Sequence, residues 1–182
     1  MPRTSALFAP LALLALTPAA AQWTSTDPSG KPLPPAANQA QQGEFGVMQI
    51  STTDPQALWA AWAQKTPGVE LHTQNTATRN QPIVSFIVFT GCTPDAQGHC
   101  NVTVDFEVLD PSGKTYGRND NAPVVDGAAP AKGMLGLSNG SLGLRVEAGE
   151  QLGDYRVLAH TTDHVSGVTL ATQQTLTITE AP

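Results

Sequence analysis

Two cysteines set between two strand-like runs constrain the fold of this chain more than any other feature. Cys92 and Cys100 are separated by seven residues, among them proline, aspartate and glycine, which favour turns. Residues 83–89, before the pair, are almost continuously apolar. In residues 102–108, after it, apolar and polar residues alternate. The pattern predicts two adjacent strands joined by a turn, with a disulfide across the mouth of the hairpin.

Two other roles of the cysteine pair compete with a disulfide. A redox pair usually has two intervening residues, whereas this pair has seven. A zinc site needs two further ligands, and His99 is the only local candidate. The spacing therefore favours a structural disulfide, which persists in an oxidising compartment.

Residues 1–21 predict a removable export signal. Arg3 provides the positive start, residues 6–16 are apolar apart from one proline, and residues 19–21 are three alanines that a signal peptidase accepts. The apolar run is too short to cross a bilayer. We expect a periplasmic or secreted mature chain without a membrane span.

The rest of the chain divides into a leader and one domain. Residues 22–43 are rich in Pro, Gln and Ala and predict a flexible leader, because they offer little apolar surface to bury. Residues 44–182 predict a β-sandwich domain. The chain has 9 Lys and Arg against 15 Asp and Glu, so it is acidic. This balance argues against nucleic acid as a partner.

One helix is expected after the first strand, which is predicted at residues 45–51. Asp54 is a favourable N-cap, Pro55 suits the first helical position, and apolar residues follow with helical spacing. Trp59 and Trp62 belong to one stripe of this helix. The stripe is expected to cover the β core, and the alternative is an exposed aromatic platform for a ligand.

The remaining sequence predicts short strands separated by turn formers every 8 to 15 residues or so, which is typical of an antiparallel sandwich. The residues expected to point inward between the sheets include Val104, Phe106, Val146, Tyr155 and Val157. Residues 119–130, which are polar and rich in Pro and Gly, are expected to form a long irregular excursion. Beyond it, strands are expected at residues 134–137, 142–147, 154–162 and 168–178.

A pattern of turn and strand residues resembles bacterial immunoglobulin-like domains. The turn Asp110-Pro-Ser-Gly-Lys114 is followed some forty residues later by Leu152-Gly-Asp-Tyr-Arg-Val-Leu-Ala159 and then by Asp163. In those domains a D-P-G-K turn precedes a G-Y-V-A strand near the C-terminal end. The resemblance covers residues 82–179 and leaves the helix outside. It implies a mainly β, antiparallel immunoglobulin-like β-sandwich of seven to eight strands. Such domains are mostly binding or spacer modules and share no catalytic residues.

Candidate binding residues are those that rigid strands would hold in loops. They are Pro94 and Asp95 in the disulfide hairpin and Val124 and Val125 in the excursion, with Trp59 and Trp62 as the alternative surface. The expected partner is an unknown protein, a glycan or an envelope component.

The alternative hypothesis is a small metal-dependent hydrolase that uses His160, Asp163 and His164. The two histidines are four apart, but on a strand this spacing separates them by about 13 Å. The sequence therefore favours solvent-exposed or turn-capping histidines. The oxygen-rich residues Asn119, Asp120, Asn121 and Asp126 lack the regular spacing of a calcium loop. No cofactor is expected, and a binding module is favoured over an enzyme.

Overall fold

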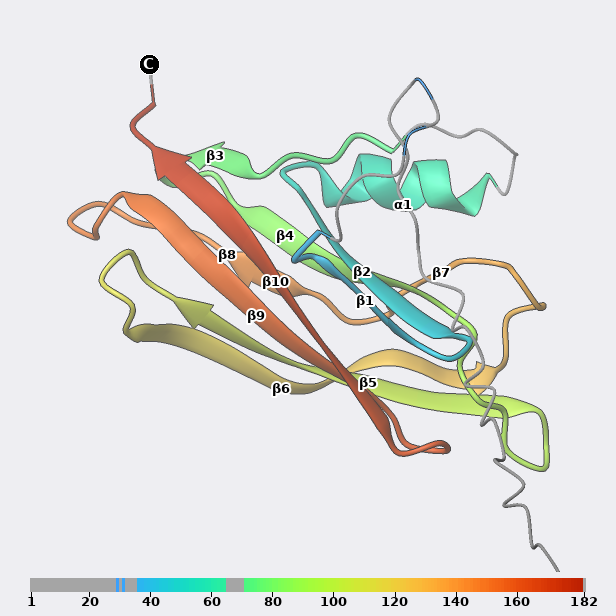
Figure 1. The fold of residues 1–182 in the computed structure, drawn as a ribbon. Coiled ribbons are helices and arrows are strands. Elements are labelled where there is room, and N and C mark those ends of the chain that lie inside the picture. Colours follow the sequence, from blue (N-terminus) through green and yellow to red (C-terminus); the bar gives the residue numbers. More distant parts are fainter. Residues whose placement is uncertain (1–28, 30, 32–35, 65–70, 182) are drawn as a thin grey trace, which may run out of the picture.

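The computed structural model describes residues 29, 31, 36–64 and 71–181, in which two β-sheets pack face to face and one helix lies against the outer face of the first sheet (Figure 1). The predicted export signal and most of the predicted leader lie outside the described residues. The elements are β1 (Gln39–Gln42), β2 (Phe45–Thr52), α1 (Pro55–Ala63), β3 (Thr76–Thr78), β4 (Ile83–Thr90), β5 (His99–Leu109), β6 (Thr115–Ala128), β7 (Gly136–Leu137), β8 (Leu142–Leu144), β9 (Gly153–Asp163) and β10 (Val168–Thr179).

Each sheet has five strands. The first has the order β1-β2-β4-β7, and β8 pairs with the other half of β4. The second has the order β3-β10-β9-β5-β6. All of these pairs are antiparallel except β3 with β10. The expected mainly β architecture, with two sheets and one helix, is confirmed.

Strand β4 is buried on both faces, as its nearly continuous apolar sequence predicts. Its inner face, with Ile87 and Phe89, packs into the core between the sheets. Its outer face, with Phe86 and Val88, packs in a second cluster with Leu58 of α1. The first sheet therefore lies between two apolar layers.

The helix begins as the sequence predicts. The Asp54 carboxylate accepts a hydrogen bond from the Ala57 backbone N–H at 2.9 Å, and Pro55 occupies the first helical position. Trp62 is partly buried against the second cluster. Trp59 packs the edge of its ring on Phe86 and remains 39% exposed.

The predicted inward-facing residues of the core are confirmed. Val104, Phe106, Val146, Tyr155 and Val157 are all buried, with exposed fractions of 1% or less. Strand β5 alternates buried and accessible positions along most of its length. This alternation is the period of two that residues 102–108 show in the sequence.

The described residues form ten strands, two more than the upper limit predicted. The first addition, β1, lies at residues expected in the flexible leader. Its backbone pairs with β2, and only Ala40 among its side chains packs against the core. The second, β3, is a three-residue parallel strand at the edge of β10. Backbone pairing at an edge requires no apolar side-chain pattern, so neither strand had a sequence signal.

The prediction of an irregular excursion at residues 119–130 is wrong. Residues 115–128 form β6, an edge strand whose pairing with β5 is interrupted by three register shifts. Such shifts accommodate Pro123 and the left-handed Asn121 without ending the strand. The strand predicted at residues 134–137 is shorter than expected, because Met134 and Leu135 are exposed and only Gly136–Leu137 pairs with β4. No helix in the described part of the chain is long and apolar enough to cross a membrane.

Candidate functional site

A recess lies at the end of the sandwich where the disulfide loop, residues 92–100, begins. Its volume is about 440 Å³. Three segments far apart in the sequence line it: the turn between β1 and β2, residues 90–92 at the end of β4, and residues 129–133 after β6. Pro94 of the disulfide loop completes the wall.

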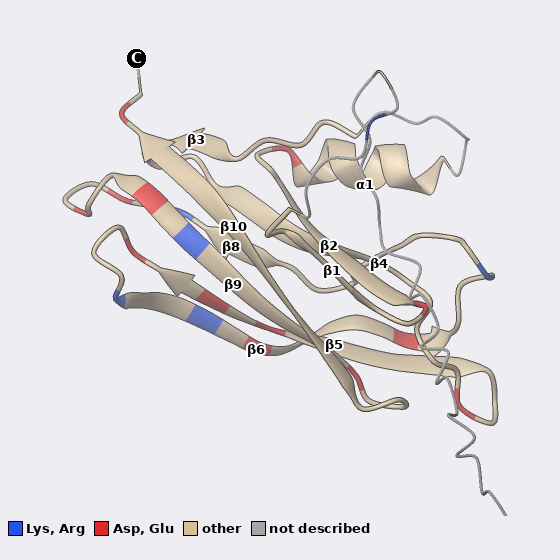
Figure 2. Ribbon diagram, in the orientation of Figure 1, with Lys and Arg blue, Asp and Glu red and all other residues tan. Residues whose placement is uncertain are grey.

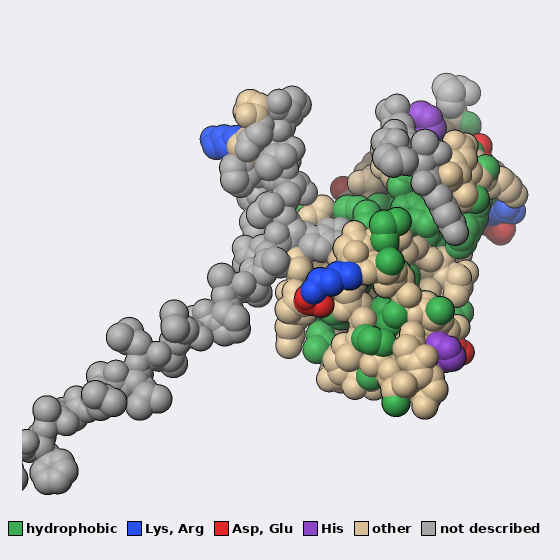
Figure 3. Space-filling model, turned by 90° about the vertical axis from the view of Figure 1, so that its right-hand side faces the viewer, with side chains coloured by type: hydrophobic (Ala, Val, Ile, Leu, Met, Phe, Trp, Pro, Cys, Tyr) green, Lys and Arg blue, Asp and Glu red, His purple; other side chains and the backbone are tan. Residues whose placement is uncertain are grey.

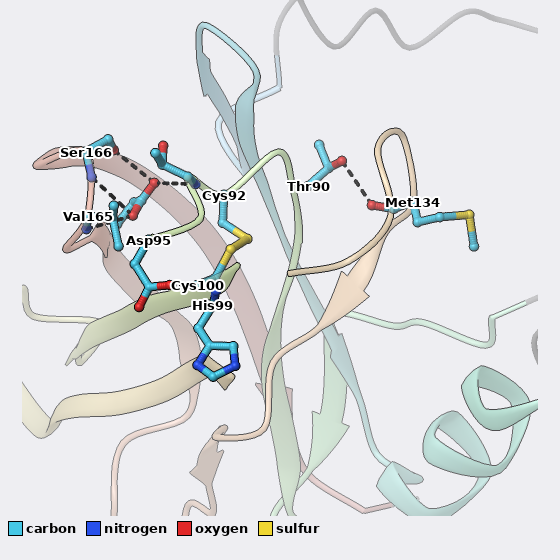
Figure 4. Close-up of a disulfide and its surroundings, with 10 residues drawn as sticks. Thr90, Cys92, Asp95, His99, Cys100, Met134, Val165 and Ser166 are labelled. Carbon is cyan, nitrogen blue, oxygen red and sulfur yellow. Dashed lines mark hydrogen bonds between the residues drawn. A yellow bond between two sulfur atoms is a disulfide. The ribbon is translucent and has the colours of Figure 1, made fainter. Parts of the chain in front are cut away.

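The predicted disulfide is confirmed and forms one side of the recess (Figure 4). The predicted hairpin is wrong, because β4 lies in the first sheet and β5 in the second, so the bond closes the loop that crosses between the two sheets. Cys92 and Cys100 are bonded, with Cα atoms 6.0 Å apart. Cys92 lines the recess, and Cys100 lies in β5 and is buried. The bond therefore fixes the recess wall to the second sheet.

Asp163, at the end of β9, holds the disulfide loop through hydrogen bonds. One carboxylate oxygen accepts from the Thr93 backbone N–H at 2.8 Å and from the Ser166 hydroxyl at 2.9 Å. The other accepts from the Val165 backbone N–H at 3.0 Å (Figure 4). Burial alone raises the pKa of the Asp163 carboxyl. The hydrogen bonds from Thr93, Ser166 and Val165 together outweigh it and hold the pKa below its ordinary value.

The turn between β1 and β2 packs tightly on the end of β4. Gly91 has a positive φ of 63°, and a Cβ atom there would lie only 1.9 Å from the Glu44 carbonyl oxygen. Only glycine allows this backbone approach. Two of the segments that line the recess, at Glu44 and at Gly91, are thus in direct backbone contact.

An ion pair joins two sides of the recess. Lys132 Nζ lies 2.8 Å from Glu44 Oε1, and the two side chains are 86% and 72% exposed. The hydrogen bond and positive charge of Lys132 lower the pKa of Glu44, and the same contact raises the pKa of Lys132. Figure 2 shows further basic residues on β6 and β9, which both belong to the second sheet.

Gln41 brings an unused acceptor to the recess. Its side-chain N–H donates to the Gly43 carbonyl at 3.0 Å. Its Oε1 atom is buried and has no hydrogen-bond partner among the described residues. An unpaired buried acceptor is unfavourable, so this oxygen favours a donor from outside the chain.

Exposed apolar side chains continue the surface beyond the recess. Met134 and Leu135 are 57% and 48% exposed. The Met134 carbonyl accepts a hydrogen bond from the Thr90 hydroxyl at 3.0 Å, while its side chain points away from the strands (Figure 4). The segment after β6 lies at the right of Figure 1, and Figure 3 shows hydrophobic side chains gathered on that side of the molecule.

The structure separates the predicted binding residues. Pro94 lines the recess, whereas the Asp95 carboxylate accepts from the Gln97 and His99 backbone N–H groups and shapes its own loop. Val124 is 1% exposed and lies in the core, and Val125 packs against it. These two valines are therefore placed in a strand and not in the expected loop.

The end of the predicted excursion does meet the disulfide loop. His99 pairs with Ala128, and the Ala129 backbone N–H donates to the Gly98 carbonyl at 3.1 Å. The two segments proposed as binding loops thus lie at one end of the sandwich, at residues 98–99 and 128–129. Trp59 and Trp62 lie on α1 and do not line the recess.

The alternative metal site is not assembled. His160 is exposed on β9, where it pairs with Asp105, and its side chain lies on the face opposite to that of buried Asp163. Nε2 of His164 lies 2.8 Å from the Thr103 hydroxyl. In the described part of the chain, no three His, Cys, Asp or Glu residues are grouped to hold a metal. The oxygen-rich residues proposed for calcium are spread along β6; they are Asn119, Asp120, Asn121 and Asp126.

Sequence reasoning missed most of the recess. Gln41, Glu44 and Lys132 belong to segments that carry no motif, and the two charged residues are 88 positions apart. The only local signal was the pair of glycines that flank them, Gly43 and Gly133, which mark turns in the sequence.

Comparisons with known proteins assign no family. No family model and no curated protein matches the chain. Among solved structures, a Niemann-Pick type C2 protein from Japanese carpenter ant aligns at 12% identity and a TM-score of 0.36, over 57% of this chain and 78% of that one. A family 123 glycoside hydrolase from Clostridium perfringens aligns at 14% identity and a TM-score of 0.37, over 74% of this chain. The alignment spans 28% of the hydrolase.

Proposed function

We propose that the protein is an exported, non-enzymatic binding module with an immunoglobulin-like sandwich as its scaffold, and that it binds its partner at the recess beside the disulfide. The observation that carries the proposal is the convergence of three segments and the disulfide loop around one recess of about 440 Å³. That volume lies within the usual range for ligand pockets.

The scaffold around the recess favours binding without rearrangement. The disulfide and Asp163 tie the disulfide loop to β5 and to the β9–β10 hairpin. A site held in its bound geometry loses less conformational entropy when the partner arrives. The disulfide also supports export, because such bonds persist outside the reducing cytoplasm.

The polar side chains of the recess support binding and not catalysis. Glu44 pairs with Lys132, and the Thr90 hydroxyl donates to a backbone carbonyl. Neither contact joins a nucleophile to a base that a third group orients, which is the arrangement that nucleophilic catalysis requires.

Site-specific photo-crosslinking in the producing cells tests the proposal. A photoreactive amino acid replaces Ala131, an exposed residue of the recess, or Ala171, an exposed residue on β10 that serves as the matched control. We expect an adduct from position 131 and none from position 171. Adducts from both positions, from position 171 alone or from neither would contradict the proposal.

A further inference from the structure

The charged and polar atoms of the recess are complementary to two groups on one ligand. Lys132 offers an ammonium group whose partner, Glu44, is itself on a flexible exposed side chain. Gln41 offers a buried carbonyl oxygen that accepts no hydrogen bond among the described residues. A matching ligand therefore has an anionic oxygen to replace Glu44 and an N–H group to donate to Gln41.

The C-terminal residue of a polypeptide carries both groups on a single Cα atom, a free carboxylate and an amide N–H. We propose that the recess captures the C-terminal end of a partner polypeptide, with its carboxylate on Lys132 and its last N–H on Gln41 Oε1, once the partly exposed Gln41 side chain turns to bring that buried oxygen into the recess. This inference rests on the proposed function, because it names the partner of the same recess. Capture of C-terminal carboxylates is an established mode of peptide recognition.

The walls of the recess fit the rest of such a ligand. Cys92, Pro94 and Pro130 provide apolar surface for a terminal side chain. The exposed Met134 and Leu135 extend that surface for the residues before it. This continuation favours a polypeptide end over a free small acid, which would leave the apolar rim uncovered.

Glu44 occupies the position that the ligand carboxylate takes. Its ion pair with Lys132 is largely exposed, and exposed pairs are weak, so a ligand that adds an N–H bond and apolar contacts displaces it. Glu44 is thus a competitor of the ligand. Removal of its charge strengthens binding, whereas removal of the Lys132 charge weakens it.

The probe is a pool of 12-residue peptides displayed with free C-termini. The peptides are selected on the immobilised protein as it is exported. The most enriched peptide is resynthesised with a free or an amidated C-terminus, and its affinity is measured by fluorescence anisotropy. We expect amidation to weaken binding about tenfold or more, because a charge-assisted hydrogen bond is lost. Lys132→Gln should cause a similar loss, and the exposed Lys114→Gln, in a turn outside the recess, should cause none.

Glu44→Gln separates the proposal from a structural role of the ion pair. We expect Glu44→Gln to tighten binding about two- to threefold, because it removes the exposed Glu44 carboxylate that competes weakly with the ligand for Lys132. If Glu44→Gln weakens binding as Lys132→Gln does, the pair merely supports the recess and the inference is wrong. No enriched peptide, or equal affinity of the acid and the amide, overturns it as well. In either case a crosslink from position 131 would leave the proposed function standing, whereas its absence would remove both.

Discussion

The Asp163 carboxylate accepts a hydrogen bond from the Thr93 backbone N–H at 2.8 Å, across 70 residues of sequence. Thr93 lies inside the disulfide loop, and Asp163 closes the β9–β10 hairpin. The contact therefore joins the wall of the recess to the second sheet at a point that the disulfide does not reach. Asp163 is fully buried, although no positively charged side chain pairs with it among the described residues.

Replacement of Asp163 by Asn should lower the free energy of unfolding by about 2 kcal/mol. One accepting oxygen becomes an NH₂ group that faces N–H donors, and a buried donor left without its acceptor costs about 1 to 3 kcal/mol. Chemical denaturation measures the change. Asp126→Asn, an exposed aspartate on β6, is the control and should change stability by less than about 0.5 kcal/mol. Equal effects of the two substitutions would show that the Asp163 contacts contribute nothing.

The contribution of Asp163 should disappear in acid. The pKa of Asp163 is lower in the folded protein than its ordinary value of 3.8, so its ionised form stabilises the fold. This stability is fully present above the unfolded pKa and is lost as the pH falls through the folded pKa. The gap in unfolding free energy between wild type and Asp163→Asn should therefore narrow between pH 6 and pH values below 3.8. Asp95 and Asp110 also have lowered pKa values, but they titrate in both proteins and cancel in the difference. A gap that stays constant with pH would contradict the assignment.

The disulfide should stabilise the fold by closing a short loop. Its cysteines are 8 positions apart, and the chain-entropy relation for a loop of that size gives about 2 to 3 kcal/mol. Replacement of both cysteines by serine should lower the unfolding free energy by that amount. Thiol titration of the denatured, unreduced protein should find no free thiol, since both cysteines are bonded. Two titratable thiols would refute the bond in the exported protein.

Phe106 should be the most costly of the predicted core residues to truncate on β5. It is 1% exposed and packs between the sheets, so Phe106→Ala should lower the unfolding free energy by about 3 to 5 kcal/mol. Leu158→Ala, on the outer face of β9, is the control because its side chain is only partly buried. A loss below about 1 kcal/mol for Phe106→Ala would mean that the core is packed differently.

The parts of the fold that were predictable carry their signal in local residues. The helix has an N-cap and an N-terminal proline, β4 and β5 have distinct apolar periods, and the disulfide is flanked by turn formers. Strands β1 and β3 could not be predicted, because polar edge strands are fixed by backbone pairing, β1 with the adjoining β2 and β3 with the distant β10. Strand β6 combines proline, glycine and polar residues, which favour a loop locally. Its pairing with β5 overrides that preference.

The recess could not be predicted from the sequence for a related reason. Its walls are built from backbone and small side chains, and its charged pair joins Glu44 to Lys132 only after both sheets have formed. Pro94 was the single predicted binding residue that lines it. A site made by convergence of turns has no sequence motif, whereas a catalytic or metal site usually has one.

The most direct test of the central claim is a map of the contact surface by nuclear magnetic resonance. The isotope-labelled protein is titrated with the partner recovered by crosslinking from position 131, and the backbone amide shifts are followed residue by residue. We expect the largest changes at residues 41–44, 90–92 and 129–133. Changes confined to α1 or to the outer face of the second sheet would contradict it, because the recess would then not be the site of binding.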